Sequence, residues 1–236
     1  MRMLTGTSGY SYKEWVGSFY PEKLPASAML RHYAEHLPTV EINNTFYRMP
    51  AEALLERWAQ EVPEGFTFTL KVPRRITHIK RLKGVESDVA EFSRRANALG
   101  DRLGMFLFQL PPTLRKDLPR LSDFLAGLPS GRNVAVGFRH KSWQDDEVYE
   151  ALRSHGAALC VAETDDDASP FVRTSDDAYL RLRRTQYSES DLRAWADRLA
   201  SQSLARAYVY FKHDEGLAPQ FARLLAETWR ATQGPA

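Results

Sequence analysis

Positively charged side chains stand near the ends of several short apolar segments of this sequence. They are, in chain order, Lys71, Arg139, Arg181, Arg183 and Lys212. Two carboxylates, Glu41 and Glu163, occupy comparable positions. Unpaired buried charge is costly, so a cluster of this composition needs anions from the protein, the solvent or a ligand. The excess of cations favours an anionic ligand, and an internal ion network that braces the fold is the alternative.

A basic segment begins at Lys71 and strengthens the interpretation of an anion site. Residues 71–83 contain six Lys or Arg residues and one His, and they contain no acidic residue. Such a segment is either a solvated run of charge or a loop that contacts phosphate, with Arg74 and His78 as contacts.

Aromatic residues follow other apolar segments and suggest stacking against a base or a sugar. They are Tyr10, Tyr12, Trp15, Phe46, Tyr47 and Trp143. Aromatic side chains interleaved with basic ones are typical of surfaces that stack a base and hold a phosphate. These residues could instead cap the end of the fold.

Metal-binding patterns are present but weak, and we assign no metal. His32-Tyr33-Ala34-Glu35-His36 has the spacing of an inverted zinc-protease motif, yet it lies in a segment expected to be a solvent-facing helix. Asp165-Asp166-Asp167 with Glu163 could ligate a hard cation, but acidic runs after strands more often solvate a loop. His213-Asp214 is better placed for acid–base work or metal binding.

The elements that must position these residues alternate along the whole chain. The predicted strands are Leu4–Ser8, Val40–Asn43, Phe66–Val72, Met105–Leu110, Asn133–Arg139, Ala157–Glu163, Tyr179–Arg183 and Tyr208–Lys212. The predicted helices are Ser27–Leu37, Ala51–Gln60, Asp88–Leu99, Asp117–Ala126, Asp146–Ser154, Ser190–Ser201 and Gly216–Trp229, with Ser27, Asp117 and Ser190 as capping residues. The polar segment Asp165–Asp177 predicts a loop or a very short helix after the sixth strand.

This alternation predicts an α/β fold, a single TIM-type (β/α)8 barrel of parallel strands that occupies residues 1–236. Apolar side chains should face the helices, which turns every second residue into the lumen. The lumen set is then Glu41, Asn43, Thr67, Thr69, Lys71, Ala135, Gly137, Arg139, Tyr179, Arg181, Arg183, Tyr208, Tyr210 and Lys212, with Gln109 and Glu163 at two further strand ends. The charged members come late in their strands, at the end where barrel active sites are built.

Composition sets the class of protein expected. The 236 residues are 43% hydrophobic and 26% charged, with a net charge of only +2, so the chain as a whole is no obvious polyanion binder. The single cysteine, Cys160, fits a reducing compartment. Without a predicted signal peptide or membrane span, we expect a soluble cytoplasmic protein.

Several motifs in order resemble the YecE-like family, number seventy-two among the domains of unknown function. They are Gly6-Thr7-Ser8-Gly9-Tyr10 with Trp15, Glu41-Ile42-Asn43-Asn44-Thr45-Phe46-Tyr47, Lys71-Val72-Pro73, Phe108-Gln109-Leu110-Pro111-Pro112, Phe138-Arg139-His140 with Trp143, and Tyr179-Leu180-Arg181-Leu182. The resemblance covers nearly the whole chain and implies a (β/α) barrel, but it implies no settled activity. The barrel is similar in outline to repair endonucleases of the endonuclease IV type, an analogy of fold only.

Three departures from the family pattern make the expected site more cationic. Gly137 stands where the family usually has Glu, Lys212-His213 stands where it tends to have Asn-Asn, and Arg183-Arg184 stands where it has His-Gly. The change at Gly137 removes a lumen carboxylate. This chain is therefore expected to have changed substrate or to have kept binding without chemistry.

Three functions are compatible with these patterns. The first is an enzyme, a hydrolase or lyase, that acts on a phosphate-bearing nucleotide, nucleic acid or sugar phosphate. The second is a non-catalytic protein that binds single-stranded nucleic acid, and the third is a carbohydrate-modifying barrel that would use Glu41 and Glu163. No cofactor and no oligomeric state is assigned.

In the enzyme, Glu41 or Asp214 would carry the proton, with His78 or His213 assisting, and Lys71 is a candidate nucleophile. The predicted catalytic residues are Glu41, Lys71, His213 and Asp214. The predicted ligand-binding residues are Tyr10, Trp15, Asn43, Tyr47, Arg74, His78, Gln109, Arg139, His140, Trp143, Arg181, Arg183 and Lys212.

Overall fold

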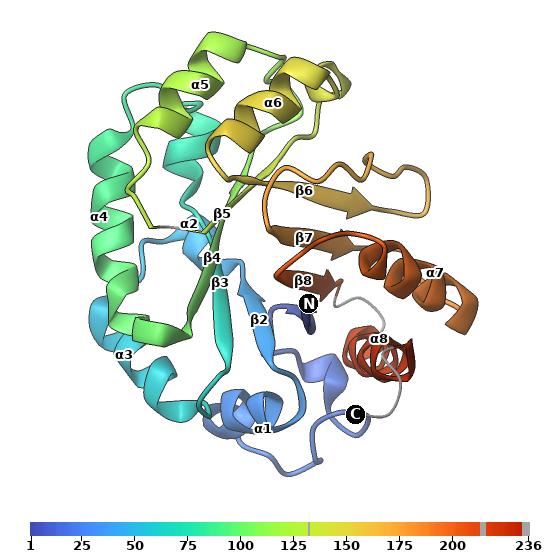
Figure 1. The fold of residues 1–236 in the computed structure, drawn as a ribbon. Coiled ribbons are helices and arrows are strands. Elements are labelled where there is room, and N and C mark those ends of the chain that lie inside the picture. Colours follow the sequence, from blue (N-terminus) through green and yellow to red (C-terminus); the bar gives the residue numbers. More distant parts are fainter. Residues whose placement is uncertain (132, 213–215, 233–236) are drawn as a thin grey trace.

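A closed barrel of parallel strands forms the centre of the molecule (Figure 1). The computed structural model describes residues 1–131, 133–212 and 216–232. Within them the strands pair in chain order and the last pairs with the first. They are β1 (Arg2–Ser8), β2 (Thr39–Ile42), β3 (Thr67–Lys71), β4 (Leu103–Gln109), β5 (Val134–Gly137), β6 (Ala158–Glu163), β7 (Asp177–Leu182) and β8 (Arg206–Phe211). The predicted TIM-type barrel is confirmed.

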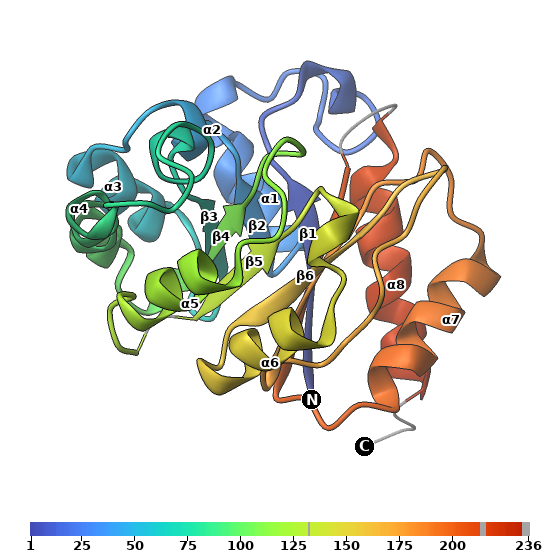
Figure 2. The ribbon, with the colours of Figure 1, turned by 90° about the horizontal axis from the view of Figure 1, so that it is seen from above.

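Helices surround the barrel in the view from above (Figure 2). They are α1 (Met29–His36), α2 (Asn44–Tyr47), α3 (Glu52–Glu61), α4 (Glu86–Ala96), α5 (Leu118–Ala126), α6 (Asp146–Ser154), α7 (Glu189–Ala200) and α8 (Ala218–Thr232). The Asp117 side chain caps α5, as predicted. Ser188 rather than Ser190 caps α7, because its hydroxyl and the Asp191 carboxylate form a capping box. Ser27 does not cap α1, whose N-terminal flanking residue is Ala28.

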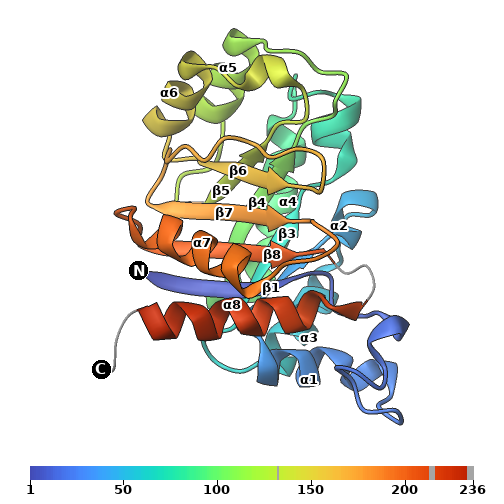
Figure 3. The same cartoon turned by 90° about the vertical axis from the view of Figure 1, so that its right-hand side faces the viewer.

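The connection between β6 and β7 contains no helix, which confirms that prediction (Figure 3). Loop residues cover this side of the barrel instead. Thr174 Oγ1 accepts a hydrogen bond from the backbone N–H of Leu159 at 2.8 Å and donates to the carbonyl of Ala157 at 2.7 Å. The ring of Phe171 lies 6.3 Å from that of Trp195 on α7. The loop therefore supplies the apolar cover that a crossover helix provides elsewhere.

The lumen has its own small apolar cluster, separate from the larger core between strands and helices. Its members are Leu4, Met105, Leu107, Ala135, Ala158, Cys160, Tyr179, Tyr208 and Tyr210. The Tyr210 hydroxyl also forms hydrogen bonds with Thr39 Oγ1 at 2.8 Å and Thr69 Oγ1 at 2.7 Å. The alternation predicted from the sequence is therefore confirmed for β2, β3, β5, β7 and β8.

The prediction that Glu163 faces the lumen is wrong. Its carboxylate accepts a hydrogen bond from the indole N–H of Trp195 on α7, at 3.3 Å, outside the barrel. Cys160 and Ala162 take the inward positions of β6 and line a cavity there. Glu41 and Glu163 consequently do not face each other, and the carboxylate pair required by the carbohydrate hypothesis is not formed.

No helix in the described part of the chain is long and apolar enough to span a membrane.

Candidate functional site

A buried ion pair crosses the lumen at the carboxyl ends of the strands. Arg181 on β7 and Glu41 on β2 are 1% and 0% exposed, and Arg181 Nη2 donates to Glu41 Oε1 at 2.7 Å. The Tyr179 hydroxyl donates to Glu41 Oε2 at 2.6 Å, and the Asn43 amide donates to Oε1 at 3.1 Å. The carboxylate is thus held by three donors.

These contacts keep Glu41 ionised. Burial alone would raise the pKa of Glu41, but the charges of Arg181 and Arg183 and the hydrogen bonds from Tyr179 and Arg181 hold that pKa at about 2. At neutral pH Glu41 is therefore the counter-ion of Arg181. The predicted use of Glu41 as a proton carrier would require these contacts to break.

Three further cations near this pair have no carboxylate partner among the described residues. They are Lys71, Arg139 and Arg183. Gln109 Oε1 accepts from Lys71 Nζ at 3.0 Å and from Arg139 Nη2 at 3.4 Å. A neutral amide oxygen satisfies hydrogen-bond donors but does not neutralise charge. The site therefore carries an uncompensated positive charge.

Burial and mutual repulsion lower the pKa of each of these cations. Burial and then the charge of Arg181 lower the pKa of Lys71 to about 8 and that of Arg183 to about 10. Burial, followed by the charge of Arg181, also lowers the pKa of Arg139. The Nε atoms of Arg181 and Arg183 are buried and have no hydrogen-bond partner in the described structure. Such donors cost free energy until an acceptor reaches them.

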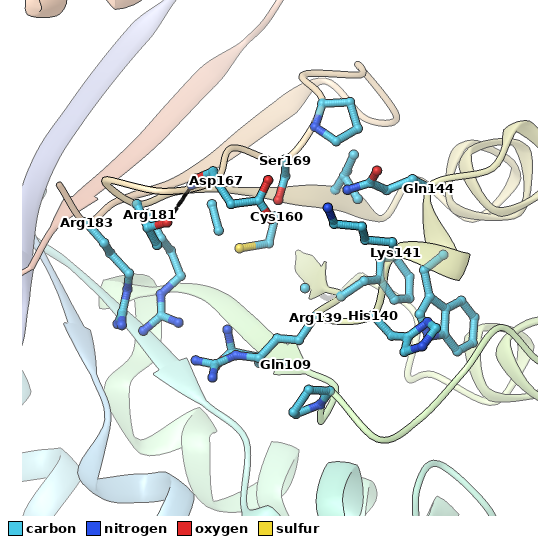
Figure 4. A pocket seen from close by; sticks show the side chains of 18 of the residues that line it. Gln109, Arg139, His140, Lys141, Gln144, Cys160, Asp167, Ser169, Arg181 and Arg183 are labelled. Carbon is cyan, nitrogen blue, oxygen red and sulfur yellow. Dashed lines mark hydrogen bonds between the residues drawn. The ribbon is translucent and has the colours of Figure 1, made fainter.

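A cavity of about 450 Å³ opens beside these groups, between the ends of β4 to β7 (Figure 4). Figure 4 shows the guanidinium groups of Arg139, Arg181 and Arg183 gathered at one end, while Lys141 and Gln144 line the other. Predicted ligand-binding residues that line the cavity are Gln109, Arg139, His140, Trp143, Arg181 and Arg183. The structure thus brings together six of the predicted residues from the ends of three strands, β4, β5 and β7.

Two of the predicted residues that line the cavity form hydrogen bonds within the protein. Ser142 N–H donates to His140 Nδ1 at 3.1 Å, which leaves Nε2 of His140 for another contact. Trp143 is almost fully buried, donates from its indole N–H to the carbonyl of Leu114 at 2.7 Å, and stacks on Phe138. Trp143 therefore forms part of the cavity wall and does not provide a face on which a ligand could stack.

Another group of predicted residues lies on the β2–β3 side and does not line this cavity. Asn43 and Lys71 belong to the lumen network just described. Tyr47 is 74% exposed on α2, and Arg74 is also exposed. His78 is half-buried, its Nδ1 lies 2.8 Å from Thr77 Oγ1, and its ring contacts Phe46 edge-on. Burial and then the charges of Lys71, Arg139 and Arg74 lower the pKa of His78, so it is neutral at neutral pH.

The basic segment 71–83 is partly neutralised by an acid the sequence analysis did not connect to it. Asp88 on α4 accepts from Arg75 at 2.8 Å and from Lys80 at 2.6 Å. Arg74, Arg81 and Lys83 remain exposed. The segment is therefore less cationic than its composition indicates.

The assignment of Trp15 as a ligand-binding residue needs correction. Trp15 is fully buried and packs against Tyr20 and Tyr33, so it is a core residue. Tyr10 is partly buried, and its carbonyl accepts a hydrogen bond from the Tyr20 hydroxyl. Neither residue lines the cavity, because the loop after β1 folds outward onto α1.

The remaining predicted residues follow β8. Lys212 is half-buried, and its backbone N–H donates to the carbonyl of Leu182 at 3.1 Å. His213 and Asp214 lie outside the described residues.

Sequence reasoning missed several residues of the cavity. They are Cys160 on β6 and Lys141, Gln144, Thr164, Asp167 and Ser169 on the loops after β5 and β6. The acidic run Asp165–Asp167 indicated that the loop after β6 carries polar side chains, but the members of this run lie apart in the structure. Asp165 accepts from the backbone N–H and hydroxyl of Thr185, whereas Asp167 lines the cavity.

Among the described residues, potential metal ligands do not gather at this rim. Within the described residues, His32, Glu35 and His36 on α1 are the one group of three, with ligand atoms within 4.8 Å of one another. Helix α1 lies outside the barrel, as the sequence predicts (Figure 1). The predicted set Glu163 with Asp165–Asp167 is not among such groups.

Comparison with known proteins places the fold and site in context. Residues 4–236 match the family model described as protein of unknown function DUF72. The UPF0759 protein YecE of Escherichia coli K12 is 34% identical over 96% of this chain and 92% of that protein. A DUF72 family protein of Thermotoga maritima, TM1631, superposes with a TM-score of 0.86 at 29% identity, over 98% of this chain and 100% of that one. The DUF72 family protein EF0366 of Enterococcus faecalis, at 18% identity and a TM-score of 0.81, over 97% of this chain and 95% of that one, shares the fold.

Proposed function

This chain belongs to the DUF72 family, and we propose that its rim cavity binds a small phosphate-bearing molecule. One observation carries the proposal: Arg139 and Arg183 line the cavity, with Lys71 beside them, and no described carboxylate pairs with any of the three. A phosphate group would supply the missing negative charge.

The hydrogen-bonding needs of the cavity agree with an oxyanion ligand. The unpartnered Nε atoms of Arg181 and Arg183 require acceptors, and a phosphate offers several oxygens to guanidinium groups. A volume of about 450 Å³ suits a nucleotide or a sugar phosphate, since small-molecule sites usually measure roughly 300–1,000 Å³.

An internal brace accounts for only part of the cluster. Arg181 and Glu41 form such a brace, because each satisfies the other in the lumen. Arg183 and Arg139 gain nothing comparable from the described residues, and each carries a lowered pKa. The remaining positive charge supports a ligand rather than a structural role.

Binding of single-stranded nucleic acid is the second candidate, and the exposed ring of Tyr47 favours it. Tyr47 contacts Phe46, which in turn contacts His78, and Arg74 is exposed on the following segment. An aromatic and basic surface of this kind suits stacked bases. A polymer that follows such a surface should release several counterions, so its affinity should fall steeply with salt.

Thermal unfolding with added ligands tests the proposal. Inorganic phosphate, sugar phosphates, nucleotides and short single-stranded DNA would be added to wild type, Arg183→Met and Arg193→Met. Arg193 is exposed on α7 and serves as the matched control. A ligand at a hundredfold excess over its Kd stabilises the folded state by about 2.7 kcal/mol. We expect this stabilisation in wild type and in Arg193→Met but not in Arg183→Met.

Three results would contradict the proposal. Equal ligand-induced shifts in both arginine variants would place the anion elsewhere. Stabilisation by DNA alone, lost steeply as salt rises, would instead favour the nucleic-acid surface. The absence of any shift would leave the cations without a ligand of either class.

A further inference from the structure

We propose that Lys71 is the nucleophilic amine of this site and forms an imine with the carbonyl group of an anionic aldehyde or ketone. The inference rests on the proposed function, because the same arginines would hold the anionic group of the substrate. Nothing in the similarity to DUF72 proteins assigns this chemistry.

The position of Lys71 suits a nucleophile. It is the last residue of β3, at the end of the barrel where the other cations gather, and its side chain is partly exposed. Nζ is fixed 3.0 Å from Gln109 Oε1 and 4.3 Å from the centre of the Phe46 ring. One hydrogen bond and one aromatic face hold the nitrogen without burying it in an ion pair.

The surroundings increase the fraction of the neutral amine, which is the reactive form. Burial, followed by the charge of Arg181, brings the pKa of Lys71 to about 8, and Arg139 and Arg183 act in the same direction. One unit below this pKa, about a tenth of the lysine is neutral, roughly a few hundredfold more than for an ordinary lysine. Desolvation and neighbouring cations are the recognised means of activating a lysine.

The arginines also select the substrate. Arg139 Nη2 and Lys71 Nζ share the Gln109 oxygen, so a cationic guanidinium group lies beside the amine. A carbonyl compound that carries a phosphate or a carboxylate would place its anionic group on the arginines and its carbonyl carbon near Nζ. An uncharged carbonyl compound of the same size would lack this attraction.

The step conserves atoms and charge. The lone pair of the neutral Lys71 nitrogen forms a bond to the carbonyl carbon, and the carbonyl π electrons move to oxygen. That oxygen takes the proton released by nitrogen, which gives a carbinolamine. Loss of water, made from the hydroxyl and the second proton of the Lys71 nitrogen, leaves the carbon–nitrogen double bond. The step needs no oxidant or reductant.

Reductive trapping tests the proposal on the intact protein. Native chain would be treated at neutral pH with sodium cyanoborohydride and dihydroxyacetone phosphate, pyruvate or uncharged dihydroxyacetone, and the adducts mapped by peptide mass spectrometry. We expect the phosphate or carboxylate compound to label Lys71 at least tenfold faster than exposed Lys83, and faster than dihydroxyacetone labels Lys71. Lys23→Arg, at an exposed position that does not line the cavity, should leave the labelling unchanged.

Lys71→Arg keeps the positive charge, so it should fold with a near-native Tm and lose the rapid adduct. Adducts spread over exposed lysines, with none favoured at Lys71, would overturn the proposal. Equal labelling of Lys71 by charged and uncharged compounds would overturn the anionic substrate class.

Thermal unfolding with inorganic phosphate separates this inference from the proposed function. If phosphate raises the Tm and no adduct forms on Lys71, the imine is excluded and the anion site stands. If phosphate has no effect and the adduct still forms on Lys71, the anion site fails and the reactive lysine stands. If neither occurs, both proposals fail.

Discussion

Arg181 Nη2 and Glu41 Oε1 lie 2.7 Å apart and join β7 to β2 across the barrel lumen. Tyr179 and Asn43 also donate to this carboxylate. The three other cations described near the pair make no ion pair with Glu41, although the charge of Arg183 also helps to hold the pKa of Glu41 low. The buried contact thus gives Arg181 a counter-ion that Arg139 and Arg183 lack.

Replacing Arg181 with Met should destabilise the barrel by about 3–5 kcal/mol, because it leaves Glu41 buried and unpaired. The double variant Glu41→Gln/Arg181→Met should recover part of this loss, since it removes both charges. Urea denaturation of the three proteins measures the free energies of unfolding. A single variant as stable as wild type would show that the pair does not hold the lumen together.

Replacing Lys71 with Met should stabilise the ligand-free protein below pH 8. The pKa of Lys71 is about 8 in the folded chain and 10.5 ordinarily, because burial and then the charge of Arg181 disfavour its ammonium form. This penalty on the stability of the folded state is full below pH 8, where Lys71 is protonated in both the folded and the unfolded chain. It fades as pH rises to 10.5. The advantage of the Met variant, measured by urea denaturation, should disappear over that window.

Lys141→Met provides the control for that comparison, because Lys141 lines the cavity but is exposed. Its stability relative to wild type should not change over the same pH range. An advantage of Lys71→Met that persists above pH 10.5 would mean that better apolar packing of the Met side chain, not the loss of charge, explains it.

Replacing Gly137 with Glu should abolish stabilisation by phosphate. The new side chain would place a carboxylate in the cavity lined by Arg139 and Arg181 and would compete with an anionic ligand. Gly137→Gln has nearly the same volume without the charge and should keep more of the phosphate response in a thermal-unfolding assay. An added Cβ would lie 3.3 Å from Cys160 Cβ and 3.5 Å from Cys160 Sγ, and Cys160→Ala in both backgrounds removes the contact with Sγ. Equal responses of the Glu and Gln variants would argue against an anion at this place.

Cys160 should resist alkylation in the native protein although it lines the cavity. Burial raises the pKa of its thiol to about 12, and the thiolate is the reactive form. Iodoacetamide labelling followed by intact mass should be slow in buffer and rapid in urea. Rapid native labelling would show that the base of the cavity is open to solvent.

The sequence predicted much of the barrel because its signals are local. Alternation of apolar and polar residues along β2, β3, β7 and β8 identified the strands and turned Glu41, Lys71 and Arg181 inward. The same rule failed in β6. The run from Ala157 to Ala162 is apolar on both faces, and Glu163 is the only polar residue from which the inward face could be predicted. Without alternation, the phase of that strand cannot be deduced.

Tertiary structure decided which charges remain unpaired. Asp88 neutralises Arg75 and Lys80 from α4. Gln109 links Lys71 to Arg139, which lie 38 and 30 residues away from it in the chain. The position of the cavity likewise depends on loops after β5 and β6 that carry no strand periodicity. The local sequence determines the type of each residue and, where polar and apolar residues alternate, the face of the strand on which it lies. The charge balance and pKa of a residue depend on distances and burial that arise only when the barrel closes.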